Sequence, residues 1–182
     1  GIQSKPAGFD IVKLEWMNGQ YLSATPASEL RPEVERQLAL LSVNADGRDL
    51  DPLIDAVKAR SRTLLQLTEQ IAVRLAGPKE FDDKAAALVR KMGPAFRSNL
   101  EVAADTLASL PIEQWTPDTL LERLKSAAAA HALKLGDAMQ PIRVALTGST
   151  VSEPVNELLA IVGRDASLER LRAAAAQSGA PV

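Results

Sequence analysis

Apolar positions recur along this chain at helical spacing, whereas the alternation typical of strands is nearly absent. The clearest apolar stripe runs from Leu53 to Leu75. Asp51 followed by Pro52 is a typical N-cap and first turn, and the pair Gly77-Pro78 ends the segment. One long helix is therefore predicted from residue 52 to 76.

Similar start and stop signals predict helices along the rest of the chain. Thr116 and Pro117 repeat the cap-and-proline arrangement and predict a helix that ends near Leu133, with Trp115 placed as a hydrophobic staple. Shorter helices are predicted at 32–42, 83–92, 94–110, 139–147, 153–162 and 167–176. The predicted fold class is all-α, with two small helical subdomains at 1–83 and 84–182.

Composition and charge are those of an ordinary folded protein. The 182 residues are 46% hydrophobic and 24% charged, with a formal net charge of −2. No apolar run approaches the roughly 18 residues of a membrane span, and no signal peptide opens the chain. We expect a cytoplasmic monomer with no membrane association. The chain starts at Gly1 rather than at a methionine, so we also expect it to be part of a longer protein.

Few residue types for catalysis or metal binding are present. The chain has no cysteine and only one histidine, His131, which excludes disulfides, thiolate metal sites and imidazole clusters. An isoelectric point of about 5.5 argues against indiscriminate binding to nucleic acid, because such affinity grows with the number of phosphates neutralised. We predict no catalytic residue and no metal ligand. A metal site built from carboxylates alone stays open, although nothing in the sequence favours it.

The stretch QPIRVALTGSTVSEPVNELL, residues 140–159, interrupts two predicted helices with a small polar patch. Ser152 is predicted as the N-cap of the second helix, so the loop from Gly148 faces a helix N-terminus with its N–H groups and partial positive charge. Arg143 lies one turn before Thr147, so both side chains project toward this loop. Such a surface suits phosphates or base edges.

The same residues also allow a purely structural interpretation. Ser152 would then only cap a helix, Arg143 would be a solvated charge, and Gly148 would end the preceding helix. Joints of this kind between two helices are common. The residues alone leave both interpretations open.

Two blocks of the sequence carry a family resemblance. KLEWMNGQYL at 13–22 and KLGDAMQPIRVALTGSTVSEPVNELLAIVGRDASLERL at 134–171 resemble, in the same order, the C-terminal anticodon-binding region of bacterial-type glutamyl-tRNA synthetases, which are class I enzymes. The similarity spans nearly the whole chain. It implies an all-helical RNA-binding portion of a translation enzyme that recognises the tRNA anticodon.

The resemblance also implies which residues meet the tRNA. The arginine of the block QPIRVALTG, here Arg143, approaches an anticodon base in this family, and the residues that start the next helix do likewise. The resulting candidate set is Arg143, Thr147, Gly148, Ser152, Glu153 and Val155. Glu153 departs from the family pattern, because its negative charge disfavours a phosphate contact. It leaves a base-edge contact open, such as acceptance from a cytosine amino group.

A second candidate arginine lies in the first predicted subdomain. Arg60 in VKARSRTL aligns with a family arginine linked to the last anticodon position, and Arg62 is a plausible substitute. Arg60 favours a synthetase specific for glutamate tRNA, although glutamine tRNA as a second substrate stays open.

The aromatic residues of the block 13–22 have two interpretations. Trp16 and Tyr21 could stack on splayed bases. In the resembled family this block joins the anticodon-binding half to the catalytic half, so Trp16, Met17 and Tyr21 are predicted to pack that joint. Sequences resembling the class I motifs HIGH and KMSKS are both missing. The fragment is therefore predicted to be non-catalytic and to need no cofactor, whereas the full-length glutamate–tRNA ligase would use ATP and Mg²⁺.

The alternative hypothesis is a helical scaffold for protein interaction that keeps this fold without binding RNA. The acidic isoelectric point, Glu153 and the low aromatic content of 3% favour it.

Overall fold

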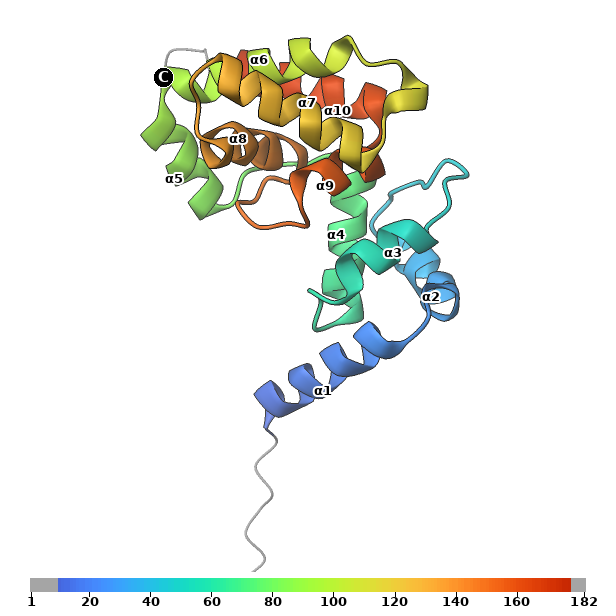
Figure 1. Cartoon of the computed structure of the whole chain (residues 1–182). Coiled ribbons are helices and arrows are strands. Elements are labelled where there is room, and N and C mark those ends of the chain that lie inside the picture. The colour runs from blue at the N-terminus through green and yellow to red at the C-terminus, as the bar shows by residue number, and fades with distance from the viewer. Residues whose placement is uncertain (1–9, 178–182) are drawn as a thin grey trace, which may run out of the picture. The chain divides into compact units, whose positions relative to one another are not determined.

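The computed structural model describes residues 10–177 (Figure 1). In that part of the chain helices are the only regular secondary structure, and loops and turns join them. The predicted all-α fold class is confirmed. Contacts divide the chain into two compact units, one ending at Ile71 and one beginning at Ala72. This division falls inside a helix and twelve residues or so before the boundary expected near residue 83. The assignment of 1–83 and 84–182 as anticodon-binding subdomains stays a prediction.

The first unit contains α1 (Ile11–Ala24), α2 (Ala27–Leu40), α3 (Asp51–Lys58) and the start of α4 (Leu64–Ala76). The helix α1 was not predicted from the sequence. Leu22 is its one buried residue, so its apolar residues do not form a stripe that faces a core. The unit's buried apolar side chains from α1 to α3 are Leu22, Ala27, Leu30, Val34, Leu38, Leu50, Leu53, Ile54 and Val57.

The single helix predicted from 52 to 76 is wrong, because the chain breaks between α3 and α4. The Ser61 hydroxyl donates to the Val57 carbonyl oxygen at 3.0 Å, and the Thr63 hydroxyl oxygen accepts from the Gln66 N–H at 3.1 Å. Thr63 and Gln66 have the spacing of a capping box, so they start a new helix. Asp51 is the first residue of α3 rather than its N-cap, and its carboxylate is paired with Arg31.

Three other helices begin three to five residues earlier than predicted, namely those expected at 32–42, 139–147 and 167–176. The first of these predictions uses Pro32 as a start signal, although this proline lies inside the helix. The helix α2 begins at Ala27 and contains Pro32, and α8 (Leu135–Thr147) contains Pro141. A proline inside a helix removes one backbone hydrogen bond and strains the preceding turn. Both helices continue through their proline.

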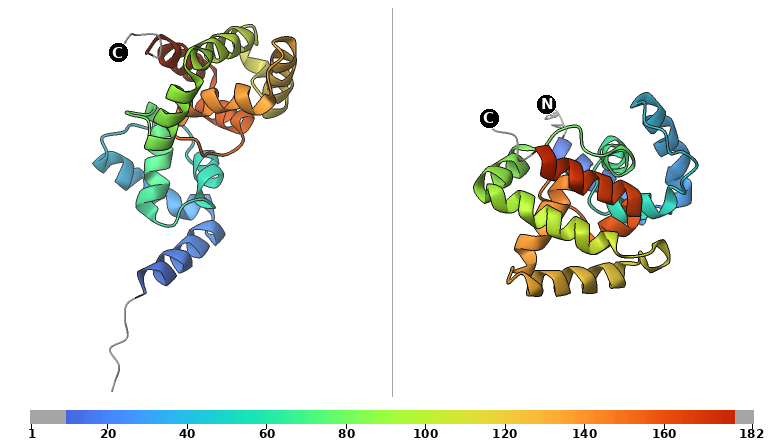
Figure 2. Two further views of the ribbon diagram at one scale, coloured as in Figure 1. Left: turned by 90° about the vertical axis from the view of Figure 1, so that its left-hand side faces the viewer. Right: turned by 90° about the horizontal axis from the view of Figure 1, so that it is seen from above.

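The second unit contains the end of α4, then α5 (Asp83–Met92), α6 (Pro94–Ala108), a 3-10 turn (Ile112–Gln114), α7 (Pro117–Ala130), α8, α9 (Val155–Val162) and α10 (Arg164–Gln177). The bounds of α5 match the prediction, and α7 starts where the Thr116 cap predicts, with the Thr116 hydroxyl oxygen accepting from the Thr119 N–H. The helices α6 and α10 lie side by side along their lengths (Figure 2).

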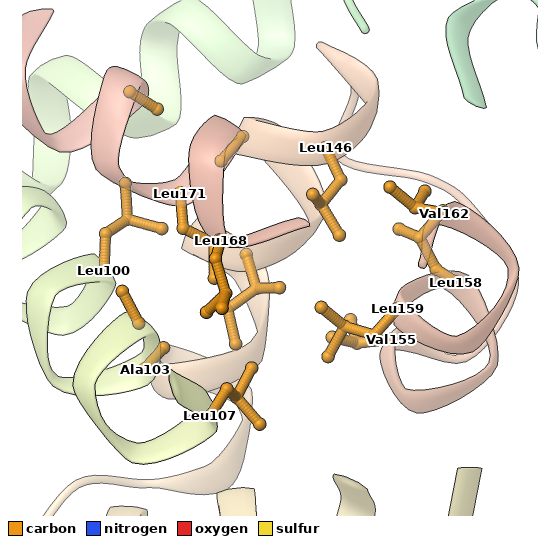
Figure 3. Packing of buried hydrophobic residues seen from close by; sticks show 14 of the residues in the cluster. Leu100, Ala103, Leu107, Leu146, Val155, Leu158, Leu159, Val162, Leu168 and Leu171 are labelled. Carbon is orange, nitrogen blue, oxygen red and sulfur yellow. The ribbon is translucent and has the colours of Figure 1, made fainter. Parts of the chain in front are cut away.

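One apolar cluster holds the second unit together (Figure 3). It receives side chains from α5 to α10, and burial of each large aliphatic side chain contributes about 1.5–3 kcal/mol. Trp115 is buried in it and donates its indole N–H to the Leu159 carbonyl oxygen at 2.9 Å, which agrees with its predicted structural role. The side chains labelled in Figure 3 are Leu100, Ala103, Leu107, Leu146, Val155, Leu158, Leu159, Val162, Leu168 and Leu171.

Candidate nucleic-acid interface

The segment 148–154 connects α8 to α9, and we call it the α8–α9 loop (Figure 1). Arg143, one turn before the end of α8, donates from Nη1 to the Ser152 carbonyl oxygen at 3.5 Å, the outer limit of a hydrogen bond. The Thr147 hydroxyl donates to the Arg143 carbonyl oxygen at 2.8 Å, so this hydroxyl is used within the helix. The structure therefore brings Arg143 and the loop together, as the sequence predicted.

Gly148 anchors the start of the loop to the segment 78–82. It adopts a left-handed conformation with φ of 71°, and its carbonyl oxygen accepts from the Asp82 N–H at 2.8 Å. A Cβ atom at this position would lie 2.5 Å from the Glu80 carbonyl oxygen and 2.9 Å from Pro78 Cβ. Gly148 thus faces the protein, and the expected contact between this glycine and a nucleotide is replaced by a backbone contact inside the unit.

Asp82 ties the same loop to the start of α5. Its carboxylate accepts from the Ala85 N–H at 2.7 Å, which makes it the N-cap of α5, and it also accepts from the Ser149 hydroxyl. The bond from Ala85 is the main reason that the pKa of Asp82 lies below its usual value, and the bond from Ser149 lowers it further against the effect of desolvation. The ionised carboxylate is therefore the form that holds the loop.

Replacing Asp82 with alanine should lower the free energy of unfolding by about 1 kcal/mol at neutral pH, because the cap is lost. The folded pKa is depressed, so this stabilisation is complete above the unfolded pKa of about 3.9 and disappears as the pH falls through the lower folded pKa. Urea unfolding at pH 7 and pH 3 measures both. Asp82→Asn, which keeps a capping oxygen without a charge, is the matched control. An equal loss for Asp82→Ala at both pH values would contradict a role for the charge.

Glu153, at the end of the loop, lies inside the unit. Its Oε1 accepts from Arg74 Nε at 2.8 Å and its Oε2 pairs with Arg74 Nη2, so the two side chains form a two-pronged ion pair. The side chains of Arg74 and Glu153 are only 3% and 1% exposed. The expectation that Glu153 meets a base edge is corrected, since its carboxylate is enclosed by protein. No sequence pattern could pair these residues, which lie 79 positions apart.

Ser152 and Val155 also differ from their expected roles. The helix α9 begins at Val155 with Pro154 as its N-cap residue, so the predicted start at Glu153 is wrong by two residues. Pro154 enforces the extended turn before the helix. The Ser152 hydroxyl donates to the Glu153 carbonyl oxygen at 2.7 Å and caps nothing. Val155 is 3% exposed and projects from α9 into the apolar cluster (Figure 3), so it supports the loop from beneath.

The exposed part of the loop is centred on Val151, which the sequence analysis missed. This side chain is 69% exposed, whereas Ser149, Thr150 and Ser152 are partly exposed and Arg143 is half-buried. One apolar residue among hydroxyl-bearing neighbours was the available signal. The hydroxyls, the backbone groups and the guanidinium can form hydrogen bonds with the edge of a base. The exposed valine can contact the apolar surface of the same base.

Arg60 and Arg62 belong to the other unit and are both exposed. Arg60 follows α3 and donates from Nη1 to the Ala56 carbonyl oxygen at 2.7 Å. The Arg62 carbonyl oxygen accepts from the side chain of Asn18 on α1 at 2.6 Å. Their geometry does not decide which arginine is the better candidate.

The helix α1 carries large apolar side chains at its surface. Trp16, Met17 and Tyr21 are all more than half exposed, together with Ile11 and Val12. Exposed aromatic and apolar groups gathered on one helix are typical of a contact surface.

Residues 10–177 lack the features of a membrane-spanning helix and of a metal-binding cluster. Within that range no helix has the length and apolar character to cross a bilayer. No group of three or more His, Cys, Asp or Glu side chains could hold a metal ion there.

Comparison with known proteins gives a consistent result. Residues 25–175 match the family model described as an anticodon binding domain. Glutamate–tRNA ligase 2 of Ruegeria pomeroyi is 36% identical over 96% of this chain, and glutamate–tRNA ligase of Xanthomonas oryzae pv. oryzae is 33% identical over 98%. The chain spans only 37% and 38% of the lengths of these two relatives. A solved glutamate–tRNA ligase from Elizabethkingia meningosepticum shares the fold over 89% of the chain, with a TM-score of 0.76 and 22% identity.

Proposed function

Because this chain belongs to the anticodon-binding domain family, we propose that it recognises the anticodon of a tRNA as part of a glutamate–tRNA ligase. The observation that carries the proposal is the position of the Arg143 guanidinium beside Ser152, the residue that follows the exposed Val151 in the α8–α9 loop. An arginine fork held next to hydroxyl and backbone groups is suited to the edge of a base that has left its stack.

Each part of this surface has a distinct role in the proposal. Arg143 donates to a base edge, and the hydroxyl of the partly exposed Thr150 is a further donor and acceptor. The hydroxyls of Ser149 and Ser152 donate within the unit, so they offer a base their oxygen atoms as acceptors. Val151 makes apolar contact with the base or its ribose. Thr147, Gly148, Glu153 and Val155, which use their polar groups or side chains within the unit, support the loop.

Arg60 is the proposed second contact to the anticodon, with Arg62 as the alternative. Both side chains are exposed and charged, so they also attract phosphates. This attraction contributes affinity that falls with salt, whereas contacts to base edges contribute selectivity. The net charge of −2 limits binding to RNA that lacks the right bases.

The longer protein is also part of the proposal. Since the chain spans well under half of its relatives' length, we place ATP, Mg²⁺ and the ligation of glutamate in a catalytic half outside it. The exposed apolar surface of α1, with Trp16, Met17 and Tyr21, would pack against that half. The protein would act as a cytoplasmic monomer on glutamate tRNA, with glutamine tRNA as a second possible substrate.

Replacing Arg143 with alanine should reduce discrimination at one anticodon base by about 1–3 kcal/mol, the worth of a good two-pronged contact. Binding would be measured with RNA stem-loops that carry a glutamate anticodon or single-base changes in it, at two salt concentrations. Arg123→Ala, which removes an exposed arginine of α7, is the control and should leave discrimination unchanged.

Two outcomes would contradict this proposal in different ways. Equal weakening for every anticodon would assign Arg143 to a phosphate instead of a base. A folded chain that binds no stem-loop at low salt would favour the alternative function, a helical scaffold that uses the exposed apolar residues of α1 for protein contact.

A further inference from the structure

The buried ion pair between Arg74 and Glu153 lies directly behind the proposed base-contacting surface. Arg74 is in the last turn of α4, and Glu153 is the residue that follows Ser152 in the α8–α9 loop. Both side chains are enclosed by the second unit, so neither can touch an RNA.

The α4 end of this pair is itself fixed to the core. Arg170 on α10 donates from Nη1 to the Val73 carbonyl oxygen at 3.2 Å, and from Nη2 to those of Arg74 and Leu75 at 3.1 and 2.9 Å. These are the last carbonyl groups of α4, which a cation satisfies well. Since α10 packs along α6 in the apolar cluster, Arg74 is a rigid support.

The other end of the pair reaches the proposed site through one peptide unit. The Ser152 carbonyl oxygen accepts from Arg143 Nη1, and the Ser152 hydroxyl donates to the Glu153 carbonyl oxygen. A shift of Glu153 therefore moves the Ser152 carbonyl oxygen that the Arg143 guanidinium contacts. A series of contacts runs from Arg170 through Arg74, Glu153 and Ser152 to Arg143.

Stability alone does not account for an ion pair at this depth. Transferring two charges out of water offsets most of their attraction, and apolar replacements of a buried pair are often neutral or stabilising. What a fork-to-carboxylate contact supplies is direction, because two parallel hydrogen bonds fix both the place and the orientation of the carboxylate. A binding loop gains affinity and selectivity when its geometry is fixed before the ligand arrives.

We propose that Arg74 and Glu153 are positioning residues for base recognition by the α8–α9 loop. They hold the Ser152 carbonyl group, and through it Arg143, in the geometry that distinguishes one base from another. The proposal rests on the proposed function of the loop and adds the part of the unit that sets its selectivity.

The test replaces both charges at once, as Arg74→Met with Glu153→Met. We expect a cooperative thermal transition close to that of the wild type and an unchanged low-salt affinity for stem-loops with a mismatched anticodon. The affinity for the glutamate anticodon should fall about ten-fold, and discrimination among anticodons should fall by the same factor. In an Arg143→Ala background the same double replacement should cause no further loss, because the pair acts through Arg143.

A matched control replaces the exposed pair of α6, as Arg97→Met with Glu101→Met, and should leave discrimination unchanged. If the buried double variant does not fold, Glu153→Gln is the second test. It keeps the side-chain shape but has one acceptor oxygen in place of two, so it fixes the loop less firmly and should lose several-fold in discrimination. A folded double variant, or a folded Glu153→Gln variant, with wild-type discrimination would overturn the proposal. So would a further loss in the Arg143→Ala background. If the wild-type chain itself shows no discrimination, the proposed function fails first, and no variant is needed to see it.

Discussion

Replacing Arg74 alone with methionine should lower the free energy of unfolding by about 3–5 kcal/mol. The variant leaves the Glu153 carboxylate enclosed at 1% exposure without the guanidinium that compensates its charge. The carboxylate must then either stay enclosed without a counter-charge or draw the end of the α8–α9 loop toward water. Both responses destabilise the native state.

The measurement is urea unfolding of Arg74→Met beside the variant that also carries Glu153→Met. Removing the second charge should restore most of the stability, because the apolar pair leaves no charge to be solvated. Arg97→Met is the control for loss of an arginine from an exposed pair, which is worth under about 1 kcal/mol. A loss of that small size for Arg74→Met would mean that water reaches Glu153, and the pair could not then fix the loop.

Local rules predicted the helices whose ends carry their own signals. Thr116 with Pro117 and the segment 83–92 were placed well, because a cap acts on residues within one turn of itself. The break between α3 and α4 had such a signal too, in the spacing of Thr63 and Gln66, but the continuous apolar stripe concealed it. The helix predicted to start at Pro32 begins five residues earlier, because a helix can tolerate the one hydrogen bond that a proline removes.

The candidate site was predictable in place but not in its internal contacts. The sequence located Arg143 and the polar loop, because they are neighbours along the chain. It could not show that Glu153 turns inward, since the reason is Arg74, which lies 79 residues away. It assigned Ser152 to a cap, although Pro154 takes the N-cap position of α9 and leaves Ser152 in the loop. Solvent exposure, which identifies Val151, depends on the whole unit and is not a property of local sequence.

Replacing Gly148 with alanine should lower the free energy of unfolding by about 2–5 kcal/mol. A side chain in the left-handed conformation costs roughly 1–2 kcal/mol. A Cβ atom 2.5 Å from the Glu80 carbonyl oxygen and 2.9 Å from Pro78 Cβ adds about 1–3 kcal/mol, because backbone must move to make room. Urea unfolding measures the sum.

Gly47→Ala separates these two contributions. Gly47 has a similar φ of 74° and nothing within 4 Å of its added Cβ, so it isolates the backbone strain. Equal losses for the two variants would show that the segment 78–82 yields freely and does not anchor the loop. A larger loss for Gly148→Ala should come with weaker discrimination among anticodon stem-loops, because the displaced backbone carries Ser149 to Ser152 away from Arg143. The loop is fixed at two ends, where Gly148 contacts the segment 78–82 and Glu153 pairs with Arg74. Releasing either end should reduce discrimination between bases, even where the exposed residues are unchanged.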